Sequence, residues 1–172
     1  MNEKNNALCE KHRDMCSISR SIDKIGDSWS LLILRDLSNG LSKYEELKNS
    51  LEIPPATLSK RLSALVGEGL LTKEIYQDNP PRAKYVLTDI GKDFLPVLAI
   101  IMMWGNKHAS PNGIDTQLVD SKTHKKVVPI IVDRETGKEI DFTKIIYAGG
   151  PANSPGKIKR LKERGIPLNA AK

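Results

Sequence analysis

The chain has 172 residues, of which 39% are hydrophobic and 28% are charged, a composition ordinary for a water-soluble globular protein. We expect one domain with an appendage. No apolar run approaches the ~20 residues that a transmembrane helix needs, and the polar N-terminal stretch lacks the apolar segment of a secretory signal. We therefore expect a cytoplasmic protein that does not contact a membrane.

The basic excess lies towards the C-terminus. The formal net charge is +6; residues 1–110 carry 15 Lys/Arg and 14 Asp/Glu, and residues 111–172 carry 12 and 7. The first part is thus nearly neutral. Nucleic-acid binding by that part must rest on the placement of individual side chains and not on total charge.

The cysteines and histidines do not indicate a metal site or a cofactor. Cys9 and Cys16 are not arranged as CxxC, and His12, His108 and His124 are scattered. A structural zinc site is therefore not expected. A disulfide between the two cysteines is also a poor default in a reducing cytosol.

The N-terminal half predicts helices. The first is indicated by the i, i+4, i+7 spacing of Ile18, Ile22 and Ile25. Gly26 interrupts it, and Ser28 can cap a second helix that ends at Asn39–Gly40. Because the second helix is apolar on nearly all sides, it belongs in the middle of a core.

Two shorter helices follow. Ser42-x-x-Glu45 forms a capping box for the first, whose inner face carries Tyr44, Leu47 and Leu51. Pro54–Pro55 breaks the pattern, and Pro55 suits the first turn of the next helix. That helix buries Leu58, Leu62, Leu65 and Val66.

The period then changes from 3.6 to 2. On either side of a QDNPP turn, alternate residues share a face: Leu71, Lys73 and Ile75 before it, and Ala83, Tyr85 and Leu87 after it. This pattern predicts a hairpin. Thr88 or Asp89 caps a long helix that is expected to run to about His108. Its apolar surface exceeds what a small domain needs from a terminal helix, so it is a candidate dimer interface.

The helix after Pro54 exposes an unusual face. Opposite its apolar stripe lie Ala56, Thr57, Lys60, Ser63 and Ala64, with Ser59 and Arg61 at the flanks and no acid until Glu68. Small residues allow close approach, and hydroxyl and basic groups donate to phosphates and base edges in a major groove. A mildly basic helix alone is more simply a solvated face. The order helix, turn, helix, hairpin favours a winged helix-turn-helix.

Several motifs together resemble the HxlR-type winged helix-turn-helix regulators, relatives of the MarR group. The carrying segments are CSISRSIDKIGDSWSLLILRDL (16–37), GLSKYEELK (40–48), IPPATLSKRLSALVGEGLL (53–71), PPRAKYVLTDIG (80–91) and LPVLA (95–99). The resemblance implies a mainly α fold with a small β wing (α+β). It also implies a bacterial homodimer, joined through its terminal helices, on the double-stranded DNA of a two-fold symmetric operator. It implies no catalytic residues.

Eight residues are the predicted DNA contacts: Lys43, Thr57, Ser59, Lys60, Arg61, Ser63, Arg82 and Lys84. Lys60 and Ser63, opposite the core stripe, are the candidate base readers. Lys43 is placed to hold a phosphate, and the wing residues Arg82 and Lys84 to reach a minor groove or phosphate. Arg61 is assigned either to a phosphate or to the neighbourhood of Glu68.

Two kinds of signal can be considered. Cys16 lies where redox-sensing members of this family place a cysteine, and a thiolate there would be favoured by a helix N-terminus. The alternative is a small buried residue at the dimer interface, with Cys9 an extra. A small-molecule effector in the dimer groove has the aromatic candidates Trp29, Tyr85 and Trp104, although each also fits a plain core.

The predicted organisation has three parts: a flexible arm over residues 1–15, the winged domain over 16–110 and an extension over 111–172. A β-hairpin is expected at about 125–147, with Gly137 in its turn and Pro129 on an edge strand. The basic segment 157–172 is either a solvated chain end or an arm that adds non-specific DNA affinity.

The function expected from these observations is a sequence-specific transcriptional regulator. The alternative is a winged-helix protein-interaction module without DNA binding, whose sign would be acidic or bulky apolar residues on the exposed helix face. An enzyme is disfavoured because the sequence shows no catalytic constellation at workable spacing. RNA binding is disfavoured because no aromatic stacking platform accompanies the basic residues.

Overall fold

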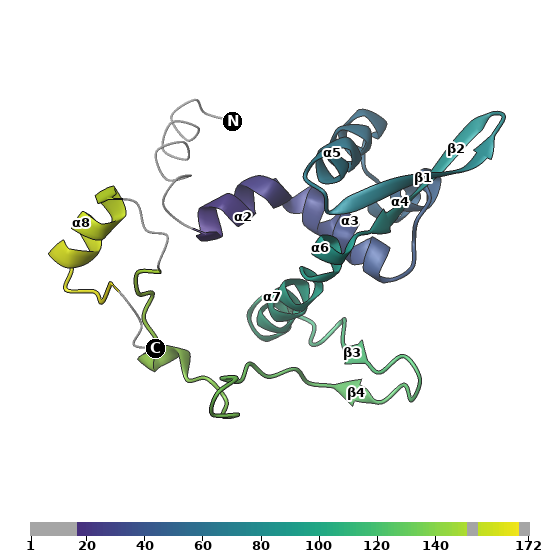
Figure 1. Cartoon of the computed structure of the whole chain (residues 1–172). Helices are drawn as coiled ribbons and strands as arrows, with labels where there is room; N and C mark the ends of the chain where they lie inside the picture. The colour runs from purple at the N-terminus through teal and green to yellow at the C-terminus, as the bar shows by residue number, and fades with distance from the viewer. Residues whose placement is uncertain (1–16, 151–154, 169–172) are drawn as a thin grey trace. The chain divides into compact units, whose positions relative to one another are not determined.

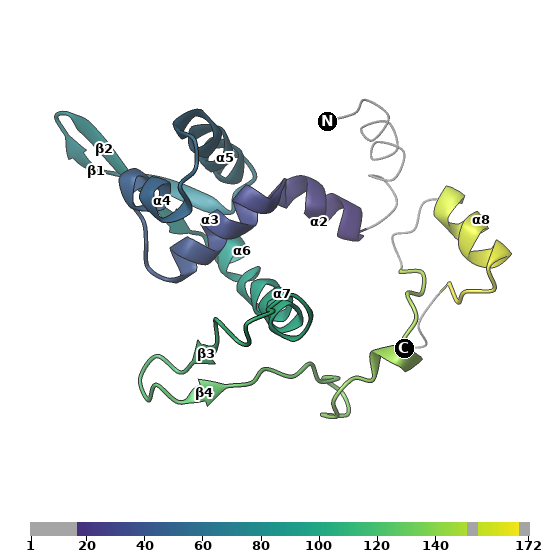
Figure 2. The same cartoon turned by 180° about the vertical axis from the view of Figure 1, so that it is seen from behind.

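The computed structural model describes residues 17–150 and 155–168. Residues 24–129 form one compact unit, drawn with the whole chain in Figures 1 and 2. In chain order the elements are α2 (Ser17–Ile25), α3 (Ser28–Ser38), α4 (Tyr44–Leu51), α5 (Pro55–Gly67), β1 (Leu71–Asp78), β2 (Pro81–Leu87), α6 (Asp89–Lys92), α7 (Leu95–His108), β3 (Leu118–Val119), β4 (Lys126–Val127), η1 (Phe142–Lys144) and α8 (Pro155–Glu163). The predicted mainly α fold with a small β wing is confirmed.

The core lies where α3, α4 and α5 meet the start of the wing. Its buried members are Ile33, Leu34, Leu37, Leu47, Ile53, Leu58, Leu62, Leu65, Leu70 and Leu71. The apolar stripe predicted for α5 supplies three of them. Burial of this stripe fixes which face of α5 remains exposed.

Two helix starts differ by one residue from the sequence prediction. The N-cap of α3 is Asp27 and not Ser28, because the Asp27 carboxylate accepts a hydrogen bond from the Ser30 backbone N–H. At α4 the acid that caps the helix start is Glu46 and not Glu45. Its carboxylate accepts from the backbone N–H groups of Ser42 and Lys43.

The turn between α4 and α5 is short. Glu52 adopts the left-handed conformation with φ of 49°, and the buried Ile53 anchors the chain before Pro54. Pro55 occupies the first turn of α5 as predicted. Because Pro55 lacks an N–H, no backbone donor is left unsatisfied at that position.

The wing is the antiparallel pair β1–β2, with Leu71 opposite Leu87 and Glu74 opposite Lys84. The Tyr85 N–H also donates to the Ser42 carbonyl at 2.8 Å, and an isolated bridge pairs Lys43 with Lys84. The segment before α4 is therefore attached to β2. This attachment ties the wing to the helix-turn-helix.

The long helix predicted from Thr88 to His108 is interrupted. Thr88 caps α6 through its hydroxyl oxygen, which accepts from the Gly91 N–H, but α6 ends at Lys92 and α7 begins at Leu95. Pro96 lies in the first turn of α7. A proline there has no N–H for a continuous helix ladder, so the single-helix prediction is wrong.

Gly91 marks a close approach of α6 to the end of the core. A Cβ at this position would lie 2.2 Å from the Leu70 carbonyl oxygen. The same region is held by the Thr88 hydroxyl, which donates to the Gly69 carbonyl at 2.7 Å. Glycine is therefore required by backbone proximity here.

The extension contains a repeated turn that the sequence prediction did not identify. VDSKTHKKV (119–127) and VDRETGKEI (132–140) share the pattern V-D-x-x-T-x-K. In both copies the aspartate carboxylate accepts from the two N–H groups two and three residues later. The left-handed positions are His124 and Gly137, with φ of 54° and 66°.

These turns change the predicted hairpin over about 125–147. The first turn closes the pair β3–β4, whereas the second closes only an isolated bridge between Val132 and Glu139. The single long hairpin is not formed: residues 126–127 pair with residues 118–119 as β4 and β3. Pro129 also has no N–H with which to continue a ladder.

Beyond residue 140 the described chain contains η1 and α8. The basic segment forms α8 up to Glu163, followed by a turn with Gly165 at φ of 64°. Cys9, Cys16 and the predicted arm over residues 1–15 lie outside the described residues. Across residues 17–150 and 155–168, no helix has the length and hydropathy needed to span a bilayer.

Candidate nucleic-acid interface

The exposed face of α5 is built by its burial pattern. Leu58, Leu62 and Leu65 are inside, which leaves Ser59, Lys60, Ser63 and Ala64 exposed and Thr57 partly exposed. Lys60 has no ion-pair partner among the described residues. Its ammonium group is available to a ligand outside the chain.

Ser59 is held by a residue that was predicted to lie on the apolar face of α4. The Tyr44 hydroxyl donates to the Pro55 carbonyl at 3.0 Å and lies 3.2 Å from the Ser59 hydroxyl oxygen. Tyr44 thus joins α4 to the first turn of α5. The sequence signal for this link was a tyrosine hydroxyl at position 44, where a purely apolar side chain would have sufficed for packing.

Arg61 has an intramolecular partner. Its guanidinium lies 2.5 Å from the Asp27 carboxylate, and the two side chains are 26% and 32% exposed. Asp27 is also the N-cap of α3. Arg61 therefore connects α5 to the start of α3, and the structure does not present it as a free cation for phosphate.

Glu68, the first acid of the α5 segment, is neutralised by a different residue. The Lys24 ammonium lies 2.8 Å from its carboxylate. The neighbourhood of Glu68 is thus occupied by Lys24 and not by Arg61, which was one of the two assignments predicted for that arginine. The acid at the C-terminal end of α5 is thus offset by Lys24.

Lys43 lies at the start of α4, within reach of several groups. Its ammonium is 3.4 Å from the Glu46 carboxylate and 5.9 Å from the centre of the Tyr76 ring. The pKa of Glu46 is lowered chiefly by the Ser42 and Lys43 backbone N–H groups. Since this carboxylate is anchored by the backbone and the pair is exposed, the ion pair of Lys43 with Glu46 is a weak one.

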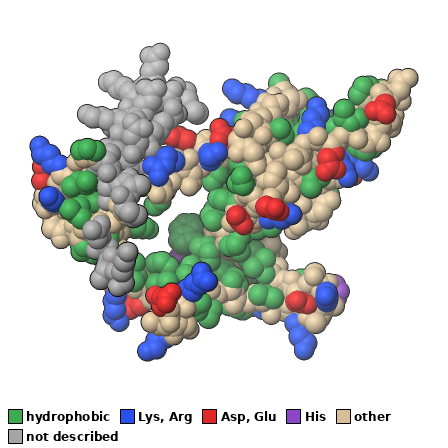
Figure 3. All heavy atoms as spheres, viewed as in Figure 1, with side chains coloured by type: hydrophobic (Ala, Val, Ile, Leu, Met, Phe, Trp, Pro, Cys, Tyr) green, Lys and Arg blue, Asp and Glu red, His purple; other side chains and the backbone are tan. Residues whose placement is uncertain are grey.

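The two basic wing residues differ. Arg82 is exposed and has no ion-pair partner in the described part of the chain. Lys84 is paired across the hairpin with Glu74 at 3.0 Å. Arg82 is therefore the freer of the two cations. Figure 3 shows Lys and Arg side chains over α5 and the wing, with acidic side chains among them on the wing.

The aromatic candidates for an effector site are separated. Trp29 and Tyr85 pack against the core, and burial raises the pKa of the Tyr85 hydroxyl. Trp104 is 63% exposed on α7 and lies beside His108, with ring centres 5.3 Å apart. Residues 24–129 do not bring the three rings together into one aromatic site.

Known proteins are similar to this chain in both sequence and arrangement. The model of the HxlR-like helix-turn-helix family matches residues 24–113. An uncharacterised HTH-type transcriptional regulator of Mycobacterium tuberculosis is 32% identical over 136 residues, which cover 78% of this chain and 86% of the relative.

Solved structures extend the likeness. A Pseudomonas aeruginosa protein described as a transcription factor is 37% identical, with a TM-score of 0.62, and covers 85% of this chain and 100% of its own. A shorter relative, the HTH-type regulator YtcD, is 27% identical with a TM-score of 0.52; it covers 55% of this chain and 97% of its own. The extension is therefore shared with some relatives and absent from others.

Proposed function

Because the chain belongs to the HxlR-like helix-turn-helix family of transcriptional regulators, we propose that it binds a two-fold symmetric operator as a homodimer. The observation that carries this proposal is the exposed, acid-free face of α5, with the unpaired Lys60 at its centre among the described residues. A helix with such a face fits a major groove. A regulator of this kind acts where the chromosome lies, in the cytoplasm.

The roles follow the exposure of each side chain. Lys60 and Ser63 read base edges, and Thr57 and Ser59 contact the groove or its phosphates from the first turn of α5. Lys43 and Arg82 hold phosphates on either side, and Lys84 contributes when it exchanges Glu74 for DNA. Arg61 is left out of this set because Asp27 binds it.

The dimer would be formed through α7. Val97, Ile101 and Trp104 recur at i, i+4 and i+7 and are 44%, 47% and 63% exposed. An apolar stripe of this kind on a helix surface is stabilised when a second copy covers it. Two copies would then present two α5 helices to successive major grooves.

Fluorescence anisotropy on the DNA beside the protein's own gene tests this function, with a scrambled duplex of the same length. We expect tight, salt-sensitive binding to the native duplex alone. Lys60→Ala with Ser63→Ala should lower the operator affinity by about 1–3 kcal/mol for each base-reading side chain removed. Lys92→Ala, which alters an exposed lysine on α6, is the matched control and should bind like the unchanged protein.

Two results would contradict the proposal. Equal affinity for the native and the scrambled duplex would show that the protein does not recognise the sequence of this DNA. No binding at low salt would favour the interaction module, with a protein partner for the dimer.

An oxidant signal at Cys16 forms a separate part of the proposal, supported by the position of this cysteine in the family motif. Oxidation of its thiolate would alter operator affinity. Treatment with diamide should release the unchanged protein from DNA and leave Cys16→Ala bound. If Cys16→Ala responds like the unchanged protein, this role is wrong.

A further inference from the structure

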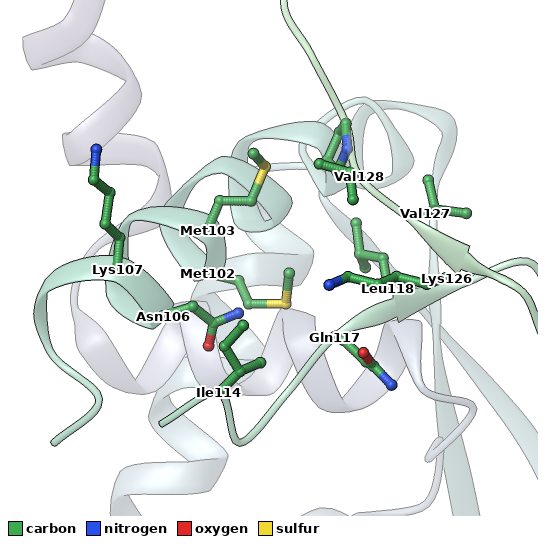
Figure 4. A pocket seen from close by; sticks show the side chains of 11 residues that line it. Met102, Met103, Asn106, Lys107, Ile114, Gln117, Leu118, Lys126, Val127 and Val128 are labelled. Atoms are coloured by element: carbon green, nitrogen blue, oxygen red, sulfur yellow. The ribbon is translucent and has the colours of Figure 1, made fainter. Parts of the chain in front are cut away.

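We propose that the extension and α7 together form a binding site for a small apolar carboxylate, distinct from the DNA-binding face. The site is a cavity of about 340 Å³ within residues 24–129, between α7 and the β3–β4 hairpin (Figure 4). Ligand pockets for small molecules begin at about this volume.

The lining is mainly apolar and adaptable. Met102 and Met103 form the α7 wall, and Leu118 and Val127 belong to the opposing hairpin. Methionine side chains are flexible and polarisable, so they fit bodies of different shape. The non-ionic part of the ligand is therefore an aromatic ring or a branched hydrocarbon.

The charged side chains of the cavity lining favour a negatively charged ligand. No acidic residue lines the cavity among the residues that the structure describes, and Lys126 has no ion-pair partner in the same part of the chain. Figure 4 shows the Lys126 ammonium directed towards Met102 and Asn106, whereas the ammonium of Lys107, which also lines the cavity, points away. An unpaired ammonium beside an apolar wall binds a carboxylate, which accepts its hydrogen bonds.

The cavity stays accessible in the proposed dimer. With 3.6 residues per turn, Met102 lies about 100° around α7 from Ile101 and about 160° from Trp104, on a different face from the exposed stripe. A partner covering the exposed stripe does not fill this site. A bound ligand would instead contact the face of α7 that the partner leaves uncovered. Its role as an effector rests on the proposed function, whereas the binding itself does not.

Isothermal titration of the full-length protein without DNA tests the site, using 4-phenylbutyrate and its neutral amide as probes. We expect the acid to bind with a Kd on the order of 0.1–1 mM, as its size allows. Lys126→Gln should weaken the acid about tenfold, the value of one charge-assisted hydrogen bond, and leave the amide unchanged. Lys122→Gln, at an exposed lysine of the same hairpin turn that does not line the cavity, should change neither.

Met102→Trp fills the cavity and should abolish binding of both probes, with thermal unfolding measured to show that the variant is folded. Equal binding of acid and amide, no binding of either, or equal effects of Lys126→Gln and Lys122→Gln would each overturn the site.

The effector role has its own readout. Anisotropy on the operator should change with 4-phenylbutyrate for the unchanged protein and not for Lys126→Gln. Unchanged anisotropy with intact calorimetric binding would overturn the effector role alone. Absence of any DNA complex without the probe would count against the proposed function and not against the ligand site.

Discussion

Two adjacent cations on α5, Lys60 and Arg61, lie in different environments that their residue types alone do not reveal. Lys60 is exposed and without an ion pair in the described residues, whereas Arg61 is bound to the N-cap of α3 through Asp27. One residue of helix rotation, about 100°, separates the two environments. The distinction depends on a partner 34 positions earlier in the chain, which no local pattern contains.

Substitution should separate these roles. Arg61→Ala is expected to lower the free energy of unfolding by about 1 kcal/mol, because it leaves Asp27 without its partner in a partly buried place. Lys60→Ala should leave stability unchanged and weaken operator binding. Urea denaturation and anisotropy on both variants check this. If Arg61→Ala is as stable as the unchanged protein but does not bind DNA, Arg61 is a DNA contact and not a structural residue.

At the scale of elements, periodicity identified most helices and both strands of the wing. The apolar repeat that suggested one helix from Thr88 to His108 continued across Pro96, so the break was hidden by a stripe that both helices share. The N-caps shifted by one residue because neighbouring polar residues compete for the same backbone N–H groups. The candidate face of α5 was predictable since it is the complement of a buried stripe.

The structure of the extension was harder to predict because it is formed by local turns and not by buried apolar faces. The pattern D-x-x-T at Asp120 and Asp133 was present in the sequence. Its signal is polar and local, whereas strands are indicated by alternating apolar residues. Such turns close through a carboxylate and need no core.

These turns should depend on pH. Hydrogen bonds from Thr123 and Thr136, chiefly from their backbone N–H groups, hold the pKa of Asp120 and Asp133 below the usual 3.8. A carboxylate with a lowered folded pKa stabilises the turn above its unfolded pKa, and this contribution is lost as the pH falls through the folded pKa.

Amide NMR signals of Thr123 and Thr136 should therefore be unchanged from neutral pH to about 4 and shift only in stronger acid. Asp133→Ala should abolish the transition at Thr136 and leave the one at Thr123, so the chain supplies its own control. Shifts that begin well above pH 4 in both turns would contradict the assigned hydrogen bonds.

At the scale of the whole molecule, α7 links the proposed functions. Its exposed stripe is the proposed surface for a second copy, its other side lines the cavity, and its N-terminal end packs through Leu98 against the core. DNA binding by a winged helix gains from dimerisation because two half-sites are occupied together.

Ile101→Glu with Trp104→Glu should convert the dimer to a monomer and weaken operator binding by at least about tenfold, since avidity is lost. Light scattering after size exclusion and anisotropy measure the two effects. Ile75→Glu, on the wing and 64% exposed, should leave the dimer intact. A dimer that survives both α7 substitutions would place the interface elsewhere.

The two turns also show how the extension is ordered without a core of its own. Each turn is closed by hydrogen bonds within its own few residues, so neither turn draws on the apolar core of the winged domain. A substitution that unfolds one turn should therefore leave the helix-turn-helix folded, and the β3–β4 wall of the cavity can be altered without cost to the DNA-binding face.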